Sequence, residues 1–216
     1  MNEIKPLRVV AFASGGGSNV RAIYDNTQNG TLNAELVGVI SNNSKCGALE
    51  HARQHNIPDF HISRMQFSSD AEFEQRLLKV LNNLKAELVV LAGYMKMMPE
   101  SIVRAYKNRM LNIHPALLPS FGGKGLYGHF VHEAVLNYGC KVSGVTVHLV
   151  DADYDTGPPV LQRCVPVMDD DTPETLAARV LKEEHIIYSQ AIQLFAKKRV
   201  HINGRRVTIL SPAHNQ

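Results

Sequence analysis

Short apolar segments of strand type alternate with amphipathic segments of helix type along nearly all 216 residues, and this alternation constrains the fold more than any other feature. The expected strands are apolar runs: Leu7–Ser14, Glu35–Ser41, Asp59–Ile62, Glu87–Gly93, Met110–His114, Val142–Val150 and Val160–Val167. The expected helices have apolar residues at helical spacing: Ser18–Asp25, Gly47–His55, Ala71–Leu84, Pro99–Tyr106, Val131–Asn137 and Pro173–Phe195. The tail, Arg199–Leu210, predicts a hairpin around Asn203-Gly204. We therefore predict an α/β protein with a doubly wound, mostly parallel sheet and helices on both faces.

Composition and charge narrow the functional classes. Hydrophobic residues make up 44% and charged residues 20% of the chain, as in most globular proteins. The formal net charge is +3 and the basic residues form no stripe, so no nucleic-acid partner is expected. No apolar run approaches the ~20 residues of a membrane helix, and the chain starts without the features of a signal peptide. We expect no membrane partner, a cytoplasmic location and reduced thiols at Cys46, Cys140 and Cys164, which form no CxxC pair.

A glycine-rich segment, Ser14-Gly-Gly-Gly-Ser18-Asn19, follows the first expected strand and opens the first expected helix. Glycines allow a ligand to approach the backbone closely, and the free N–H groups of a helix N-terminus favour a phosphate. A dinucleotide site fits less well, because Val20 replaces the third glycine of that fingerprint and the second strand ends without an acidic residue. The segment predicts a phosphomonoester site; the alternative is a glycine-rich turn that only reverses the chain.

Asn112 and His114 end the fifth expected strand. Residues i and i+2 of a strand point to the same side, so the two side chains face one space. An amide N–H can stabilise an oxyanion, worth about 10²–10³ in rate, and an imidazole can move a proton, worth about 10²–10⁴. The pair suits acyl transfer through a tetrahedral intermediate; a hydrogen-bonded structural histidine is the alternative.

Three acids, Asp151, Asp153 and Asp155, follow the strand that contains His148. Their spacing matches part of a calcium loop, but the glycine and the terminal glutamate of that motif are misplaced. Two interpretations remain. The acids form a solvated loop, or one carboxylate lies beside His114, orients it and raises its pKa.

Two other polar groups have weaker signals. His129, His132 and Glu133 lack the HExxH spacing and a third ligand, so no metal site is expected. Glu184 lies in a charged stretch inside the last expected helix, where charged residues usually face solvent.

Four segments resemble the folate-dependent formyltransferases in order and spacing: SGGGSN, VVLAGYMKMMP, LNIHPALLPSF and GVTVHLVDADYDTGPPVLQ. The resemblance spans about residues 7–200. It implies a Rossmann-like formyltransferase fold in a single domain. It also implies transfer of the formyl group of 10-formyltetrahydrofolate, a co-substrate, to the amine of glycinamide ribonucleotide in purine biosynthesis. Small-molecule substrates, no metal and a monomer or homodimer are the corresponding expectations.

The resemblance also assigns roles to individual residues. It places the phosphate of the ribonucleotide at Gly17, Ser18 and Asn19, and the glycinamide at Glu184. It assigns catalysis to Asn112, His114 and Asp155, with Asn112 and protonated His114 stabilising the oxyanion and Asp155 keeping His114 charged near neutral pH. It assigns folate binding to Asn112 and to two segments: Met95, Lys96, Met97 and Met98, and Asp151, Ala152, Asp153, Tyr154 and Asp155.

Some positions depart from the family pattern. Asp70 stands in the segment where members often have an arginine for the folate tail, so we expect Lys96 to replace it or the tail to remain in solvent. Leu181, followed by Lys182, stands where some members have a lysine near the phosphate. The glycine-rich segment Ser120–His129 is unlike that of some relatives, so its role in closing the site stays open.

The expected single domain, residues 1–216, has a phosphate-binding half of about 1–100 and a folate and catalytic half of about 101–216. Two relatives are weighed against this interpretation. Formyltetrahydrofolate deformylases share the catalytic trio but lack the GGGSN loop and carry an extra N-terminal domain, whereas the first strand here begins at Leu7. Methionyl-tRNA formyltransferases add a C-terminal RNA-binding domain, for which little chain remains after Phe195. A non-catalytic phosphometabolite-binding protein, which would need the glycine-rich loop but not the trio, is the third alternative.

Overall fold

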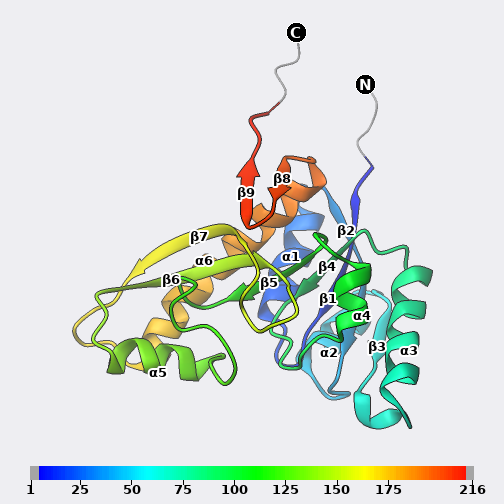
Figure 1. Cartoon of the computed structure of the whole chain (residues 1–216), viewed down its shortest axis with the longest axis horizontal. Coiled ribbons are helices and arrows are strands. Elements are labelled where there is room, and N and C mark those ends of the chain that lie inside the picture. Colours follow the sequence, from blue (N-terminus) through cyan, green and yellow to red (C-terminus); the bar gives the residue numbers. More distant parts are fainter. Residues whose placement is uncertain (1–4, 213–216) are drawn as a thin grey trace.

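Seven strands form the central sheet of the computed structural model, which describes residues 5–212 (Figure 1). They are β1 (Leu7–Phe12), β2 (Ala34–Ser41), β3 (Asp59–His61), β4 (Leu88–Leu91), β5 (Met110–His114), β6 (Val142–Leu149) and β7 (Pro159–Pro166). Their order is β3-β2-β1-β4-β5-β6-β7. The first five strands pair in parallel, and β6 is antiparallel to both of its neighbours. The mostly parallel sheet is therefore confirmed, and the chain folds as a single α/β domain, of which residues 1–4 and 213–216 lie outside the described part.

The helices connect these strands nearly where the sequence predicts them. They are α1 (Ser18–Gln28), α2 (Gly47–Gln54), α3 (Asp70–Asn83), α4 (Glu100–Ala105), α5 (His129–Asn137) and α6 (Pro173–Ala196). The predicted hairpin is confirmed as β8 (Val200–Asn203) and β9 (Arg206–Ile209), whereas the 3-10 turn η1 (Arg64–Gln66) is not predicted. No helix within residues 5–212 is long and apolar enough to cross a membrane.

Two apolar cores lie on opposite faces of the sheet. Along β1, Val9 and Ala11 pack with α1, α2 and α6, while Val10 and Phe12 pack with α3 and α4. This alternation follows from the two-residue period of a strand, and it requires helices on both faces. The predicted doubly wound arrangement is confirmed (Figure 1).

The topology sets the place of the site. Strand order reverses between β1 and β4, and ligands of open α/β sheets bind beyond the carboxyl ends of strands at such a switch point. The backbone N–H of Ser14, after β1, donates to the carbonyl of Gly93, after β4, so the two loops are held side by side. On the sheet side of α6, the Tyr188 hydroxyl lies 3.0 and 3.1 Å from the carbonyls of Leu91 and Leu111, which fixes the helix against β4 and β5.

Candidate active site

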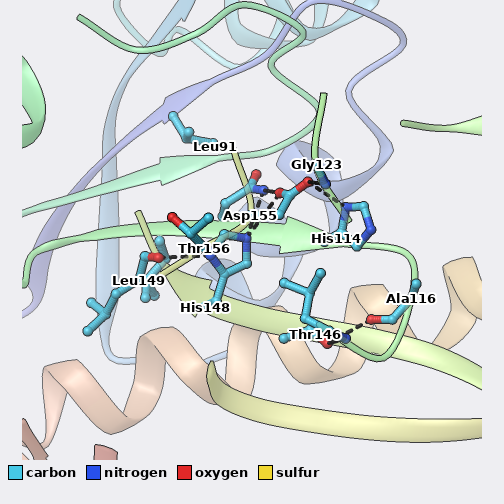
Figure 2. Close-up of polar contacts among 12 residues, drawn as sticks. Leu91, His114, Ala116, Gly123, Thr146, His148, Leu149, Asp155 and Thr156 are labelled. Carbon is cyan, nitrogen blue, oxygen red and sulfur yellow. Dashed lines mark hydrogen bonds and ion pairs between the residues drawn. The ribbon is translucent and has the colours of Figure 1, made fainter. Parts of the chain in front are cut away.

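Asp155 is the centre of a buried polar cluster at the ends of β5 and β6. Its Oδ2 lies 3.5 Å from Nδ1 of His114 and accepts a hydrogen bond from the backbone N–H of Gly123 at 3.0 Å. Its Oδ1 lies 3.5 Å from Nε2 of His148. The carboxylate therefore lies between two imidazoles, as Figure 2 shows. Asp155 thus lies beside His114, as one of the two interpretations of its loop predicted. His148, which was not predicted as a site residue, contacts the same carboxylate.

Asn112 joins the same cluster through its side-chain amide. Its Nδ2 lies 3.1 Å from Nε2 of His148 and 3.3 Å from Oδ1 of Asp155. Because Nδ1 of His148 lies 2.8 Å from the Leu149 carbonyl, we assign the His148 proton to Nδ1, which leaves Nε2 free to accept from Asn112. Both amide N–H groups thus have acceptors within the protein, and one must turn away before it can bind an oxyanion.

The net direction of the His114 pKa shift differs from the expectation. Burial lowers the pKa of His114 and outweighs the Asp155 carboxylate and the Phe121 carbonyl, which raise it. The net pKa shift of His114 is therefore opposite in direction to the contribution of Asp155. Nε2 of His114 lies 2.8 Å from the Phe121 carbonyl, and Nδ1 faces Asp155. Both ring nitrogens therefore face acceptors, an arrangement that only the imidazolium satisfies fully. Burial alone would raise the pKa of Asp155, but His148, His114 and the Gly123 N–H lower it overall.

A cavity of about 400 Å³ opens over this cluster. Asn112, His114 and Asp155 line it together with Met95, Tyr154 and the glycine-rich segment 123–128. Glu184 and Asn19 also line it, although they belong to α6 and α1. Side chains from distant parts of the sequence therefore meet above the catalytic candidates.

The glycine-rich loop borders a second cavity of about 520 Å³, which shares Asn19, Met95 and Glu184 with the first. Gly17 has φ +76° and is the N-cap of α1, without a side-chain hydrogen bond to the free N–H groups of the first turn. Asn19 Nδ2 donates to Glu184 Oε2 at 2.7 Å. Burial raises the pKa of Glu184, and this hydrogen bond opposes the shift. The predicted phosphate residues and Glu184 thus share one wall.

The predicted folate segments line neighbouring hollows. A cavity of about 570 Å³ contains Lys96, Met97, Met98 and Ala152. A small hollow of about 60 Å³ is lined by Asp151, Ala152, Asp153, Tyr154 and Asp155, and also by Asn112 and His148. It shares residues with both the larger cavity and the catalytic one. A continuous set of hollows therefore runs from Lys96 to the Asp155 cluster.

The 570 Å³ cavity also holds the residue at which this chain departs from the family pattern. Asp70, at the first turn of α3, forms an ion pair with the guanidinium of Arg64 from η1. Arg64 Nη1 also donates to the Phe67 carbonyl at 2.8 Å. A cation thus lies beside Asp70 in the same cavity, and the sequence analysis missed it.

Comparisons with known proteins bear on this arrangement. The sequence model of the formyl transferase family matches residues 7–192. The chain belongs to the formyl transferase family. It is 42% identical to the chloroplastic phosphoribosylglycinamide formyltransferase of Arabidopsis thaliana, an alignment that covers 99% of this chain and 74% of that protein.

Solved structures of the family extend the similarity to the fold. Glycinamide ribonucleotide transformylase 1 from Symbiobacterium toebii superposes with a TM-score of 0.90 at 40% identity, covering 96% of this chain and 95% of that one. A formyltetrahydrofolate deformylase from Pseudomonas syringae superposes with a TM-score of 0.85 at 24% identity, covering 95% of this chain and 66% of that one. At that identity the deformylase shows a shared fold alone.

Two residues beneath the trio support it from β6. In the β5–β6 register, Asn112 pairs with His148 and His114 pairs with Thr146. The buried Thr146 hydroxyl donates to the Ala116 carbonyl at 2.7 Å (Figure 2). It also accepts from the Leu118 N–H at 3.0 Å, and the two bonds hold the chain just after His114. The alternation of β6 already places Thr146 and His148 on one face, but only the antiparallel pairing puts that face against Asn112 and His114.

Metal ligation has no candidate in the described part of the chain, where no three His, Cys, Asp or Glu side chains are arranged to hold an ion.

The lysine that some family members have near the phosphate has no counterpart in the cavity: Lys182 is exposed, and Leu181 lines the 520 Å³ cavity in its place. The polar chemistry of the site is that of amide, imidazole and carboxylate groups.

Proposed function

We propose that this protein transfers the formyl group of 10-formyltetrahydrofolate to the amine of phosphoribosylglycinamide, a step of de novo purine biosynthesis. The observation that carries the proposal is the junction of the two cavities at Asn19 and Glu184. A transferase must hold two substrates with their reacting atoms in contact, and this positioning supplies much of the rate enhancement. The membership of the formyl transferase family and the 42% identity to an enzyme with that printed activity support the same reaction.

The donor occupies the hollows between Lys96 and the Asp155 cluster. The pteridine ring lies against the loop of residues 151–155, and Met97 and Met98 contact the apolar middle of the molecule. Lys96 and Arg64 are the cations of the 570 Å³ cavity, and they bind the carboxylates of the folate tail. Arg64 thus supplies the charge that Asp70 cannot, at the expense of its ion pair with Asp70.

The acceptor binds with its phosphate at Gly17, Ser18 and Asn19, where the open N-terminus of α1 favours an anion. Its glycinamide reaches Glu184, which lines both cavities. The buried carboxylate, whose pKa is raised, accepts a proton from the ammonium group of the acceptor and leaves the amine free to attack.

The chemistry then proceeds at the trio. The amine nitrogen attacks the formyl carbon, and the carbonyl oxygen becomes an oxyanion that accepts hydrogen bonds from Asn112 and from protonated His114. As the tetrahedral intermediate collapses, the bond from carbon to N10 breaks, N10 receives a proton from His114, and the former amine nitrogen gives its extra proton to the neutral imidazole, directly or through water. Asp155 stabilises the imidazolium, which the neighbouring acceptors favour although burial opposes it.

The test follows the consumption of 10-formyltetrahydrofolate by absorbance, with and without phosphoribosylglycinamide, in wild type and His114→Ala. We expect turnover that requires the ribonucleotide and falls by about 10³-fold or more in the variant. Turnover without the ribonucleotide would establish a deformylase instead. No turnover together with phosphometabolite binding would establish a binding protein.

The protein carries out this reaction in the cytoplasm, as a monomer or homodimer. Cell fractionation tests the compartment, and sedimentation at several protein concentrations tests the oligomeric state. Recovery in an organelle, or an assembly larger than two chains, would contradict these statements.

A further inference from the structure

The 520 Å³ cavity has a second wall, formed by the first turn of α5. Gly128, His129 and His132 line the cavity from this helix, while Gly17, Ser18 and Asn19 line it from α1. Both helices pack against α6. No ligand contact was expected for α5 from its sequence.

Two side chains that line this cavity each carry a buried polar atom that lacks a partner. Among residues 5–212, neither Nδ1 of His132 nor Oδ1 of Asn19 makes a hydrogen bond. Both side chains are more than nine-tenths buried, with 4% of His132 and 7% of Asn19 exposed. Buried polar atoms in folded proteins nearly always have a partner, because an unpaired one loses its hydrogen bonds to water without replacement. The two atoms indicate a polar ligand: Nδ1 of His132 can donate to a ligand oxygen, whereas Oδ1 of Asn19 can only accept from a ligand N–H or O–H.

The electrostatics of the cavity favour a phosphate although no lysine or arginine lines it. The N-caps of α1 and α5 are Gly17 and Gly128, and neither helix start has a side-chain cap. Both helix N-termini border this space and each favours an anion, although in α5 the N–H groups of Phe130 and Val131 already donate to the carbonyls of Tyr127 and Gly128. The carboxylate of Glu174 also lines the cavity, with Oε1 3.7 Å from Nδ1 of His129.

His132 contributes a donor rather than a charge. Burial, together with His129 and His114, lowers its pKa to about 4, so the imidazole is neutral at physiological pH. A neutral imidazole carries one N–H, which is available at Nδ1 in one of its two tautomers. A phosphate oxygen accepts such a hydrogen bond readily, and the bond is strengthened because the acceptor is charged.

We propose that Nδ1 of His132 donates a hydrogen bond to the phosphate of the acceptor ribonucleotide, which is bound between the N-terminal turns of α1 and α5. This inference rests on the proposed function, because it takes the phosphomonoester acceptor as the ligand. It adds a second, uncharged half to the phosphate site, supplied by α5.

Three substitutions at His132 separate a hydrogen bond from a packing role. Asn carries its amide nitrogen on the same Cγ that carries Nδ1 in histidine, so His132→Asn keeps a donor at nearly the same place. His132→Leu keeps apolar packing and removes the donor, and His132→Gln moves the amide one bond farther out. We expect the KM for phosphoribosylglycinamide to rise about 10- to 30-fold in the Leu and Gln variants and less than about threefold in the Asn variant. A packing role predicts the reverse order, with Leu tolerated best.

The phosphate assignment has its own probe. Ribose 5-phosphate, used as a competitive inhibitor, contains the phosphate and sugar but no glycinamide. We expect its inhibition constant to rise in His132→Leu and His132→Gln by the same factor as the KM, while the KM for 10-formyltetrahydrofolate stays within about twofold. An unchanged inhibition constant would overturn the contact with the phosphate. Because Gln retains a polar side chain, it provides the answer if the Leu variant does not fold.

Controls separate this inference from the proposed function. His201→Ala, an exposed histidine of β8, is expected to leave all constants within about twofold of wild type. If the wild type itself lacks activity with the ribonucleotide, the proposed function fails. If the wild type is active and the Leu and Gln variants keep its KM, the role of His132 alone is overturned.

Discussion

The two cavities that meet at Glu184 differ in how their polar groups are satisfied. Around Asp155, each polar side chain of the trio already has a partner: Asn112 donates to His148 and Asp155, and His114 lies between Asp155 and the Phe121 carbonyl. Around the glycine-rich loop, Asn19 and His132 each keep a buried polar atom without a partner within residues 5–212.

This difference separates reaction from recognition. A catalytic cluster that is bonded internally holds His114 and Asp155 in place before the substrates arrive, and only an N–H of Asn112 has to leave its acceptor to bind the oxyanion. A binding wall with open donors and acceptors gains its partners from the ligand. Substitutions in the first region should therefore act mainly on kcat, and those in the second mainly on KM.

The largest expected effect comes from removing the charge at the centre of the catalytic cluster. Asp155 has φ +56°, a left-handed conformation that asparagine adopts readily, so Asp155→Asn keeps both backbone and size. Loss of the carboxylate removes the group that raises the pKa of His114 and leaves an imidazolium without its counter-charge. We expect kcat to fall about 10³-fold, with KM values within about fivefold, in steady-state kinetics with both substrates.

Asp153→Asn is the matched control for this change. Asp153 lies in the same loop and lines the folate hollow, but its exposed carboxylate is outside the bonded cluster, so its substitution should alter kcat by less than about threefold and act mainly on the KM for 10-formyltetrahydrofolate. Equal losses in the two variants would mean that the loop acts through its total charge, and the distinction between a bonded cluster and a solvated loop would fail.

The second-largest effect is expected when a methyl group is added to the glycine-rich loop that borders the 520 Å³ cavity. At Gly17 a Cβ would lie 2.7 Å from Cα of Ala48, in a backbone with φ +76°, so the loop must shift away from α2. Gly17→Ala should raise the KM for the ribonucleotide about 10- to 30-fold and lower the free energy of unfolding by about 1–3 kcal/mol. Gly16→Ala, where a Cβ meets nothing within 4 Å, should leave both quantities nearly unchanged in kinetics and urea denaturation.

The fold could be predicted from the sequence because the buried residues of its core follow the two-residue period of strands and the 3.6-residue period of helices. The runs at Leu7–Ser14 and Ala71–Leu84 match β1 and α3 to within two residues at each end, since strand and helix periodicity decide which side chains are buried. The reversed direction of β6 was not predicted, because a buried apolar strand reads the same in either orientation. The first turn of α5 was missed because Gly128 and the glycines before it obscure the helical pattern.

The candidate site could be predicted only where its residues are local in sequence. Asn112 and His114 share one side of β5, so strand geometry alone places them together. The contact of Asn19 with Glu184 joins residues of α1 and α6 that no periodicity connects. The net direction of the His114 pKa shift was beyond the sequence too, because it depends on how burial compares with Asp155.

The smallest expected effect on activity is at the junction of the two regions. Glu184→Gln keeps an acceptor for the Asn19 amide but cannot take a proton from the acceptor amine. Because the amine can lose its proton to water, we expect kcat/KM for phosphoribosylglycinamide to fall only about 10-fold, with the loss shrinking as pH rises. A loss that is the same at every pH would assign Glu184 to binding alone.

The same substitution should stabilise the protein, which sharpens the contrast with Asp155. Burial raises the pKa of Glu184, so the folded state binds its proton more tightly than the unfolded state does. Stability from this group is then complete below the unfolded pKa of about 4.3 and is lost as pH rises through the folded pKa. Glu184→Gln removes that loss, so its melting temperature should exceed that of wild type at pH 7 and match it near pH 4.

For Asp155, whose pKa is lowered, the sign is opposite: its contribution is present at pH 7 and is lost in acid, so Asp155→Asn should melt below wild type at pH 7. Melting temperatures that change in opposite directions in the two variants would show that the partners of Asp155 stabilise its ionised form, whereas the surroundings of Glu184 favour its protonated form. Changes in the same direction would contradict the contrast between the two cavities.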